Sequence, residues 1–330
     1  MNPMVRLVHV GSAVVDLVYR IPRLPERGGE AVARRFDRLP GGGFNVMAAA
    51  RRSGMRVAYA GPHGSGPNGD FLREAMARED IEILLPPTPG LDTGTCVVLV
   101  TDDAERTFVS HAGAEGHAEE AALASLPLGP GDVVFTSGYS LSYPGSVDAV
   151  SRLVETLPAE TPFVLDPAPV VTEVPAGILG RMLARVTWLS LNRAEARVIA
   201  GEGDDGELAE RLLRRHCPRA SGVILRRGEA GCILAQPGRG LTEVAAFPVE
   251  AIDTNGAGDV HVGAFLASLS GGDDPAAAVR FANAAAALST TRTGGGDAPT
   301  RNEILDFMNR YGRGTPNAER TIGDFAANPG

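Results

Sequence analysis

The chain has 330 residues, 44% of them hydrophobic and 22% charged, a length that can bury a large core in one α/β domain with an appendage or in two domains. Its net charge of -9 argues against nucleic acid or an anionic membrane as the main partner, because both favour a basic surface. All 31 basic residues are arginine, which excludes P-loop NTPases, protein kinases, Schiff-base enzymes and pyridoxal-phosphate enzymes, since each class needs a lysine.

Short β-rich runs alternate with helical patterns along most of the chain. The runs that predict strands are Val5–Val10, Val57–Ala60, Val133–Thr136, Phe163–Leu165, Thr187–Leu191, Gly222–Leu225 and Cys232–Ala235. The patterns that predict helices are Asn45–Ser53, Gly69–Arg78, Ser146–Thr156, Arg193–Ala200, Glu207–His216, Ala257–Ser270 and Pro275–Thr291. This alternation predicts a mostly parallel sheet covered by helices on both faces.

Two segments interrupt the alternation. Val14–Arg38 and Thr95–Ser110 predict extended chain with interleaved polar residues and no helix between the extended runs. The second segment contains the acidic turn Asp102–Glu105, which predicts a hairpin. Insertions of this kind can form a small second sheet beside the main domain. From Gly312 onward the chain is polar and contains Gly and Pro, which predicts a loosely held tail.

The sequence predicts neither a signal peptide nor a membrane-spanning helix. No apolar run approaches the roughly 20 residues that a transmembrane helix needs. The N-terminus leads directly into Val5–Val10, without the pattern of a signal peptide. Cys96, Cys217 and Cys232 are far apart and form no CxxC pair, so we expect reduced thiols and a cytoplasmic location.

The strongest chemical signal is Asp253–Asp259, with the sequence Asp-Thr-Asn-Gly-Ala-Gly-Asp, followed by the apolar stretch Val260–Leu269. Small residues at a helix start let backbone N–H groups converge on an oxyanion, and the helix N-terminus adds partial positive charge. Asp259 beside such a site is suited to taking a proton from an attacking hydroxyl while the amides stabilise a transferring phosphoryl group. Taken alone, the segment is also compatible with a glycine-rich turn capped by aspartate.

A second glycine-rich segment, Pro40–Asn45, leads into another helical stretch. Its three glycines permit close approach of the backbone to a ligand. Asn45 can donate and accept hydrogen bonds there, although a helix N-cap explains it about as well. Asp16 follows the first strand and has oxygens that can accept hydrogen bonds from a polyol, although such a residue is in isolation more often part of a turn.

Six segments resemble motifs of the ribokinase-like (PfkB) carbohydrate kinase family, and they occur in the same order along most of the chain. Gly11–Asp16 together with Gly41–Asn45 resembles the N-terminal signature of the family, and Asp253–Asp259 resembles its C-terminal signature D-T-x-G-A-G-D. The other three matches are the N-x-x-E motif, a nucleotide-side strand and turn, and a late helix beside the adenine pocket: Leu191–Glu195, Arg226–Gly231 and Phe281–Ala286.

The resemblance implies a ribokinase-like, doubly wound α/β fold, in which helices cover both faces of a mostly parallel sheet and a small β-sheet forms a lid over the acceptor site. The core would comprise residues 1–13, 41–93 and 112–311, the lid residues 14–40 and 94–111, and the loosely held tail residues 312–330. Because the edges of a small lid sheet often pair with a second subunit, we expect a homodimer through the lid.

The resemblance also implies a role for each matching residue. Asp259 is the catalytic base, and Gly256, Ala257 and Gly258 form the anion hole. The acceptor residues are Asp16, Gly42, Gly43 and Asn45, and the nucleotide residues are Asn192, Arg227, Gly228 and Asn283. Glu195 serves Mg²⁺ through water, because Mg²⁺ usually keeps several waters. Asp253 holds a monovalent cation such as K⁺, which only some members of the family need.

The selectivity for the acceptor is expected to come from the lid hairpin and from Ser137–Tyr139. Glu115 and Tyr139 can hydrogen-bond to the acceptor or stack on it, although Glu115 can equally be a solvated surface charge. The chain departs from the ribokinase pattern at Arg226 and Arg227, where Thr-Leu is common, and either arginine can contact phosphate instead.

Several other residues have simpler interpretations. We expect His261 to be packed and satisfied within its helix. Asp166 either helps to organise the metal site or begins a turn. The pairs Arg34-Arg35, Arg51-Arg52 and Arg214-Arg215 are interpreted as solvated faces of helices or strands.

The sequence thus predicts an ATP- and Mg²⁺-dependent kinase that phosphorylates a hydroxyl of a small sugar or sugar-like acceptor. A nucleoside kinase of the same fold remains an alternative, because the lid does not distinguish a hexose, a pentose, a sugar acid and a nucleoside. A ligand-binding relative without catalysis is a weaker alternative. A dinucleotide-dependent oxidoreductase is disfavoured because no G-x-G-x-x-G follows the first strand, where Gly11-Ser12-Ala13-Val14 stands. Several segments resemble poorly characterised bacterial sugar kinases more than ribokinase itself.

Overall fold

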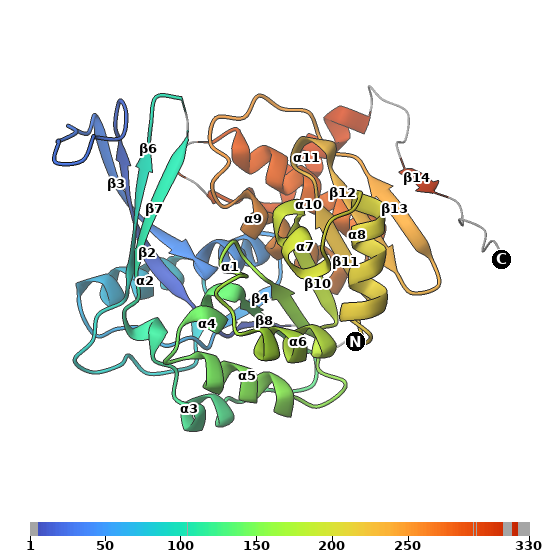
Figure 1. The fold of residues 1–330 in the computed structure, drawn as a ribbon, viewed down its shortest axis with the longest axis horizontal. Helices are drawn as coiled ribbons and strands as arrows, with labels where there is room; N and C mark the ends of the chain where they lie inside the picture. Colours follow the sequence, from blue (N-terminus) through green and yellow to red (C-terminus); the bar gives the residue numbers. More distant parts are fainter. Residues whose placement is uncertain (1–5, 104, 293, 295, 313–318, 323–330) are drawn as a thin grey trace.

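A ten-stranded sheet forms the centre of the molecule (Figure 1). The computed structural model describes residues 6–103, 105–292, 294, 296–312 and 319–322. The strand order is β14-β13-β12-β11-β10-β9-β8-β1-β4-β5. In chain order these strands are β1 (Arg6–His9), β4 (Arg56–Tyr59), β5 (Glu82–Ile83), β8 (Asp132–Ser137), β9 (Phe163–Asp166), β10 (Trp188–Asn192), β11 (Gly222–Arg226), β12 (Cys232–Gln236), β13 (Gly240–Val244) and β14 (Glu319–Ile322).

The sheet is parallel from β5 to β11 and antiparallel from β11 to β14. At its centre, Leu7 of β1 lies opposite Val57 of β4 on one side and Val133 of β8 on the other. Strands buried on both faces need apolar side chains on both faces, which explains the continuous apolar runs. The prediction of a mostly parallel sheet is confirmed, and so are the predicted strands within it.

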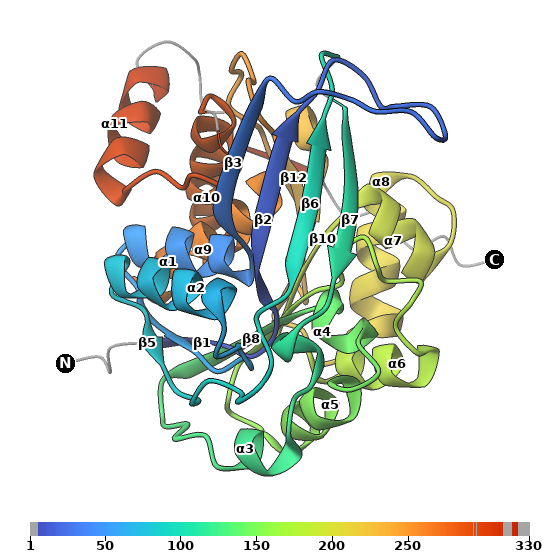
Figure 2. The same ribbon diagram turned by 90° about the vertical axis from the view of Figure 1, so that its left-hand side faces the viewer.

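Helices cover both faces of this sheet, as the alternating pattern predicted (Figure 2). One layer contains α1 (Gly43–Arg52), α2 (Pro67–Arg78), α9 (Ala257–Ser270), α10 (Pro275–Thr290) and α11 (Arg301–Gly312). The other contains α3 (Glu120–Ala124), α4 (Gly138–Ser142), α5 (Val147–Thr156), α6 (Ala176–Arg185), α7 (Arg193–Ala200) and α8 (Asp205–Arg211). Each layer buries its own apolar core against the sheet. Among the described residues, no helix is both long enough and apolar enough to cross a membrane.

The helices α1 and α9 approach one another closely at Gly263. A Cβ at this position would lie 2.3 Å from the carbonyl oxygen of Val46 and 2.7 Å from the Cβ of Ala49. The absence of a side chain therefore allows the two backbones to touch. This contact fixes the start of α1 and the start of α9 relative to one another, and both starts belong to the signature segments.

A separate four-stranded sheet stands beside the main sheet (Figures 1 and 2). Its order is β3-β2-β6-β7, formed by β2 (Ala13–Arg20), β3 (Arg35–Gly42), β6 (Thr95–Val100) and β7 (Arg106–His111). The strands β2 and β6 are parallel, whereas the other two pairs are antiparallel. The predicted hairpin is confirmed as β6 and β7, in which Val98 lies opposite Phe108. We call this sheet the lid.

The two faces of the lid differ in chemistry, because successive side chains of a strand point to opposite sides. Asp16 and Arg20 share one face with Val18, Val98 and Val100, which form a small apolar core. This face turns toward the main domain, and we call it the inner face. The outer face carries Arg38 and Thr107 beside a larger group of apolar, partly solvent-exposed side chains: Leu17, Tyr19, Phe36, Val97, Leu99 and Val109.

The structure contains elements that the sequence did not predict, among them the strands β5 and β13. Within the segment predicted as a loosely held tail, β14 (Glu319–Ile322) lies antiparallel to β13. Residues 313–318 and 323–330 of that tail lie outside the described residues. Among the described helices, α3, α4, α6 and α11 were not predicted. In α6, Gly177 and Gly180 weaken the local helical signal, and packing of Met182 and Leu183 against the core compensates.

Candidate active site

Two neighbouring cavities meet at the start of α9. The larger has a volume of about 880 Å³ and the smaller a volume of about 130 Å³. Ala257 and Gly258 line the larger cavity, whereas Asp259 lines the smaller one. The first turn of α9 therefore presents its backbone to one cavity and its carboxylate to the other.

The turn that precedes α9 depends on Gly256. Its φ is +70°, in the left-handed region, and a Cβ there would lie 2.7 Å from the Cα of Gly296. Among the described residues, no side chain caps this helix end with a hydrogen bond. The first N–H groups of a helix have no carbonyl partner within the helix, and they lie at the positive end of its dipole. The predicted anion-hole residues Gly256, Ala257 and Gly258 thus form a site suited to an anion.

The carboxylate of Asp259 lies at the wall of the smaller cavity, close to the amide of Asn45. Asn45 Nδ2 donates to Asp259 Oδ2 at 3.4 Å. Burial, with a smaller contribution from the negative charge of Asp166, raises the pKa of Asp259 to about 7. The hydrogen bond from Asn45 and the positive charge of Arg226 act in the opposite direction. A carboxyl with a pKa near 7 is well matched to proton transfer at neutral pH.

Four of the predicted acceptor residues line the smaller cavity together with Asp259: Asp16, Gly42, Asn45 and Tyr139. Burial raises the pKa of Asp16 to about 7. Its carboxylate lies against Gly41, where a Cβ would be 2.3 Å away from it. The segment Gly41–Asn45 therefore brings bare backbone beside Asp16, and the predicted approach of this loop to a ligand site has a steric basis.

Gly43 lies behind this wall rather than in it. Its N–H donates to the carbonyl oxygen of Ser12 at 3.0 Å. A Cβ at Gly43 would lie 2.1 Å from Nε2 of His9. Gly43 thus allows α1 to pack against β1. We predicted that it contacts the acceptor, but it lies behind the residues that line the smaller cavity.

Glu115 does not lie where acceptor contact was expected. It is only 1% exposed, and it is not among the residues that line the smaller cavity. Its carboxylate accepts hydrogen bonds from the N–H groups of Gly113 at 2.8 Å and Gly94 at 3.0 Å. Both alternatives for this residue, acceptor contact and a solvated charge, are therefore corrected: Glu115 ties the start of β6 to the segment that follows β7.

The lid contributes much of the smaller cavity. Thr95, Cys96, Phe108, Ser110 and His111 come from β6 and β7. Tyr143 lines the same cavity and was not singled out from the sequence. It directly follows α4, the short helix that contains Tyr139, so recognition of this helix from the sequence would have drawn attention to it.

The larger cavity contains three of the predicted nucleotide residues. Asn192, Gly228 and Asn283 line it, and Arg227 does not. Arg227 donates instead to Glu243 Oε1 at 3.2 Å and to the carbonyl oxygen of Ala230 at 3.0 Å. Its neighbour Arg226, the last residue of β11, lines the cavity. Of the two arginines, Arg226 and not Arg227 therefore lines the larger cavity, where we predicted an arginine beside the nucleotide.

Arg226 is held in a cluster of charges beside the anion hole. Its Nη1 donates to Asp166 Oδ2 at 2.8 Å and to the carbonyl oxygen of Gly258 at 3.2 Å. Its Nη2 lies 3.7 Å from Oε2 of Glu195. Burial and the negative charge of Asp166 raise the pKa of Glu195 above its usual range. The guanidinium is therefore fixed between two carboxylates and the first turn of α9.

Asn283 uses its whole side-chain amide within the protein. Its Nδ2 donates to the carbonyl oxygens of Val244 and Ala245, at 3.1 and 3.0 Å. Its Oδ1 lies 3.1 Å from Nε2 of His261 and 3.1 Å from Sγ of Cys232. Asn283 thus shapes the cavity wall, and its amide is already paired. His261 is packed as expected, although its Nδ1 has no hydrogen-bond partner in the part of the chain that the structure describes, and burial lowers the pKa of His261 to about 3.

The acidic residues near the larger cavity are not arranged as a set of direct metal ligands. In the described part of the chain, no group of three or more His, Cys, Asp or Glu side chains could hold a metal ion. Both oxygens of Glu195 accept from Asn192, from its N–H at 2.8 Å and from Nδ2 at 2.7 Å. These residues fit a metal that arrives with the nucleotide and is contacted through water better than one held directly.

Asp253 is surrounded by donors. Arg106 Nη2 donates to its Oδ1 at 2.5 Å, and Arg20 Nη2 lies 3.7 Å from its Oδ2. The N–H of Asn255 donates to Oδ1 at 3.0 Å and that of Gly294 to Oδ2 at 3.4 Å. A monovalent cation needs free oxygen ligands, whereas these oxygens face guanidinium and amide groups. The arrangement does not fit the cation that was expected at Asp253.

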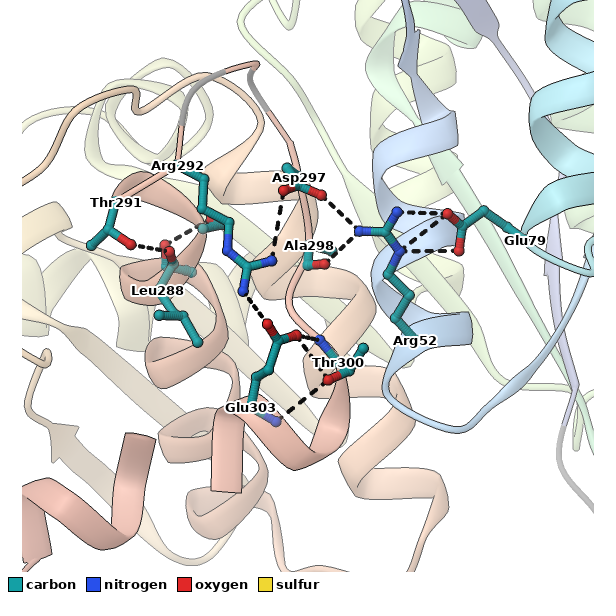
Figure 3. A network of polar contacts seen from close by, with 11 residues as sticks. Arg52, Glu79, Leu288, Thr291, Arg292, Asp297, Ala298, Thr300 and Glu303 are labelled. Atoms are coloured by element: carbon teal, nitrogen blue, oxygen red, sulfur yellow. Dashed lines mark hydrogen bonds and ion pairs between the residues drawn. The ribbon is translucent and has the colours of Figure 1, made fainter. Parts of the chain in front are cut away.

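A network of ion pairs holds the segment between α10 and α11, which packs against the turn before α9 (Figure 3). Arg52, at the end of α1, donates to Glu79 at 2.6 Å, to Asp297 at 2.8 Å and to the carbonyl oxygen of Ala298 at 2.7 Å. Arg292 donates to Glu303 at 2.6 Å and lies 3.6 Å from Asp297. The sequence led us to interpret Arg52 as a solvated side chain, whereas in the structure it joins three partners.

The comparisons with known proteins agree with the fold. The sequence profile of the pfkB family carbohydrate kinases matches residues 4–301. The chain therefore belongs to this family and is a carbohydrate kinase by family. It is 34% identical over 299 residues to the uncharacterized sugar kinase YegV of Escherichia coli (strain K12), covering 90% of this chain and 92% of that protein.

Solved structures share the fold at lower sequence identity. Ribokinase from Thermotoga maritima superposes with a TM-score of 0.77 at 23% identity, covering 92% of this chain and 99% of that one. A double mutant of fructokinase from Vibrio cholerae O395, with fructose, ADP and a potassium ion bound, gives a TM-score of 0.76 at 22% identity, covering 92% and 98%. The predicted ribokinase-like fold is thus confirmed.

Proposed function

We propose that this chain transfers the terminal phosphoryl group of ATP to a hydroxyl group of a small sugar or sugar-like acceptor. The observation that carries the proposal is the position of Asp259 at the start of α9, between a nucleotide-sized cavity and a smaller cavity under the lid. A volume of about 880 Å³ lies in the range of small-molecule and cofactor sites. The smaller cavity, with a volume of about 130 Å³, is the one that would take the acceptor.

In this mechanism the acceptor hydroxyl lies within reach of Asp259 and gives its proton to the carboxylate as the oxygen attacks the terminal phosphorus of ATP. The backbone N–H groups after Gly256 and the guanidinium of Arg226 stabilise the negative charge on the transferring group. Asp16 and Asn45 orient the acceptor through its other hydroxyl groups. The bond between the terminal phosphorus and the oxygen that joins it to ADP breaks, and ADP leaves from the larger cavity with the electron pair of that bond.

Mg²⁺ enters with ATP as part of the substrate, and its chemistry is to neutralise phosphate charge. The chain would contact it through water from Glu195 and Asn192, at the edge of the larger cavity. Burial raises the pKa of Glu195, and a cation beside this carboxyl would act in the opposite direction, because it favours the charged form.

The test is a screen for acceptor-dependent release of ADP, over hexoses, pentoses, sugar acids and nucleosides. At least one sugar should support turnover, and Asp259→Asn should lower it by about 10²- to 10⁴-fold. Arg227→Met is the matched control, since its side chain faces Glu243 and not the larger cavity. Turnover of Asp259→Asn within a few fold of the unmodified protein would show that the base is wrong.

The same screen, together with binding and thermal-shift measurements, separates the other hypotheses. Turnover with nucleosides and with no sugar would replace the sugar kinase by a nucleoside kinase. Binding of both sugar and nucleotide without transfer over hours would support a ligand-binding relative without catalysis. A thermal shift with NAD(P) and none with ATP or ADP would favour an oxidoreductase.

The lid also supports the expectation of a homodimer. Phe36 and Val109 are 51% and 60% exposed on its outer face, beside the partly exposed Leu17, Tyr19 and Val97. Exposed apolar side chains gathered on one sheet face are typical of an interface. Sedimentation of the purified protein is expected to give twice the mass of the chain, and Val109→Glu should lower it.

A further inference from the structure

Two arginines of the lid converge on the first residue of the signature segment. Arg20 of β2 and Arg106 of β7 flank Val100 of β6 in one cross-strand row, so both guanidinium groups lie on the inner face. Arg106 Nη2 donates to Asp253 Oδ1 at 2.5 Å, and Arg106 Nη1 donates to Thr254 Oγ1 at 3.0 Å. Arg20 Nη2 lies 3.7 Å from Asp253 Oδ2. The lid therefore contacts the segment that ends in the anion hole.

The carboxylate of Asp253 has little room for another positive group. Asp253 is 8% exposed, and the side chain of Arg106 is 16% exposed. Each carboxylate oxygen already faces one arginine and one backbone N–H, those of Asn255 and Gly294. An arginine stays protonated at every physiological pH, so an alkali cation at this carboxylate would be repelled by both guanidinium groups.

We propose that the guanidinium of Arg106, assisted by Arg20, takes the place of the monovalent cation at Asp253, so that this kinase works without K⁺. The inference rests on the proposed function, since it concerns how the anion hole of that reaction is held in place. Asp253 receives its positive partner from the lid instead of from solution. This is where the chain departs from what the resemblance implied.

The exchange has a mechanistic consequence. A dissolved cation reaches Asp253 independently of the acceptor, whereas Arg106 is carried by the same strand as Phe108 and Ser110, which line the acceptor cavity. A lid that shifts to admit or release the acceptor also moves the partner of Asp253. Acceptor binding and nucleotide binding are therefore coupled through Arg106, and the coupling must be reciprocal.

The first experiment uses the unmodified full chain in the chloride salts of K⁺, Na⁺ and choline at equal ionic strength. Two quantities are measured: acceptor-dependent release of ADP, and the thermal midpoint of the complex with MgADP. Both are expected to change little, with turnover within about 2-fold across the three salts. A loss of about 10-fold or more on replacing K⁺ by choline overturns the inference.

The second experiment uses Arg106→Met, which removes the charge and keeps the apolar stem. In this variant K⁺ should raise the thermal midpoint of the MgADP complex relative to choline, and should raise turnover by about 5-fold or more. Arg34→Met is the matched control, because Arg34 pairs with the exposed Asp102 elsewhere in the lid, and it should stay indifferent to K⁺.

The outcomes of these experiments are distinguishable from failure of the proposed function. If Arg106→Met binds MgADP equally well in K⁺ and choline, whether or not it is active, the guanidinium does not stand in for a cation and the inference is wrong. If Arg106→Met does not fold, the salt dependence of the unmodified chain still decides. If no acceptor supports turnover, the proposed function fails, while the MgADP measurement still tests this inference.

Discussion

Asn45 Nδ2 lies 3.4 Å from Asp259 Oδ2, although 214 positions separate the two residues in the sequence. Each residue lies in the first turn of a helix, Asn45 in α1 and Asp259 in α9. The contact joins the two glycine-rich segments that the sequence singled out. Through it, the amide of Asn45 donates a hydrogen bond to the carboxylate that the proposed mechanism uses as its base. The predictions below begin from this pair.

The activity of the enzyme is expected to rise with pH through neutrality. Asp259 must be ionised to accept a proton, and its pKa of about 7 means that only part of the protein is competent below that pH. A plot of log kcat/KM for the acceptor against pH should therefore have an ascending limb near pH 7. An ascending limb near pH 4, as for an ordinary aspartate, would contradict the assignment.

Removal of the amide at position 45 should shift that limb. The hydrogen bond from Asn45 lowers the pKa of Asp259, so its loss in Asn45→Ala raises the pKa further. The ascending limb should move to higher pH, and KM for the acceptor should increase. The exposed Asn309→Ala on α11 is the control and should leave the profile unchanged. A shift to lower pH in Asn45→Ala would show that the amide does not stabilise the carboxylate.

Asp259 is expected to reduce the stability of the free protein near neutral pH. Its pKa is about 7 in the folded state, against about 4 for an unfolded aspartate, so the folded state holds an extra proton between these values. The stability associated with that proton is present at low pH and is lost as pH rises through 7. Asp259→Asn should therefore increase the free energy of unfolding at pH 8 by about 1–3 kcal/mol.

Urea unfolding at pH 5 and pH 8 measures this effect. The advantage of Asp259→Asn over the unmodified protein should be larger at pH 8 than at pH 5. The exposed Asp306→Asn on α11 serves as the control and should give the same small difference at both. An advantage that shrinks as pH rises would reverse the sign of the argument.

Arg226 is expected to affect both rate and stability. Arg226→Met removes the fixed positive charge beside Gly258 and should lower kcat by about 10²- to 10³-fold. It also leaves Asp166 and Glu195 without their common partner, which should lower the free energy of unfolding by about 3–5 kcal/mol. Steady-state kinetics and urea unfolding separate the two effects. If Arg227→Met proves the more damaging to kcat, the assignment of the nucleotide-side arginine must be exchanged.

Gly41→Ala should impair the acceptor site selectively. The added Cβ would lie 2.3 Å from the carboxylate of Asp16, so that side chain must move. KM for the acceptor should rise by about 10-fold or more, because a positioning carboxylate is displaced, while the affinity for MgADP stays the same. Gly129→Ala is the control, since nothing lies within 4 Å of a Cβ at that position. Equal effects on acceptor and nucleotide would indicate a general disturbance of the fold.

The network around Arg52 should contribute measurably to stability. Arg52→Met removes donors to Glu79, Asp297 and the Ala298 carbonyl, and should lower the free energy of unfolding by about 1–3 kcal/mol. The adjacent Arg51→Met is the comparison, because Arg51 pairs with the exposed Asp80 and should cost at most about 1 kcal/mol. Equal losses in the two variants would show that the network adds nothing beyond a surface ion pair.

Much of the fold and the site could be predicted because the signals are local. The alternation of apolar runs and helical patterns identified the sheet, and small residues at two helix starts identified the loops beside Asp16 and Asp259. These features depend on backbone conformation and burial, which leave periodic and compositional traces over a few residues.

The parts that escaped prediction depend on contacts between distant segments. Nothing near Glu115 in the sequence indicates that its carboxylate accepts from Gly94 and Gly113. The direction of Arg226 and Arg227 depends on where β11 ends. Arg106 meets Asp253 across 147 positions, and this contact exists only because the lid folds back over the start of α9. Pairings of this kind have no periodic signal.

The absence of a side chain at Gly263 has a consequence for how this kinase can diversify. Because α1 and α9 touch there, the spacing between Asn45 and Asp259 is set deep in the main domain and not by the lid. Substitutions at Cys96, Phe108 or Ser110 can therefore change which acceptor is taken while the geometry of proton transfer is preserved. Under the proposed function, a new acceptor preference is accessible through lid residues alone, whereas a single methyl group at 263 would push Asn45 and Asp259 apart whatever the lid holds.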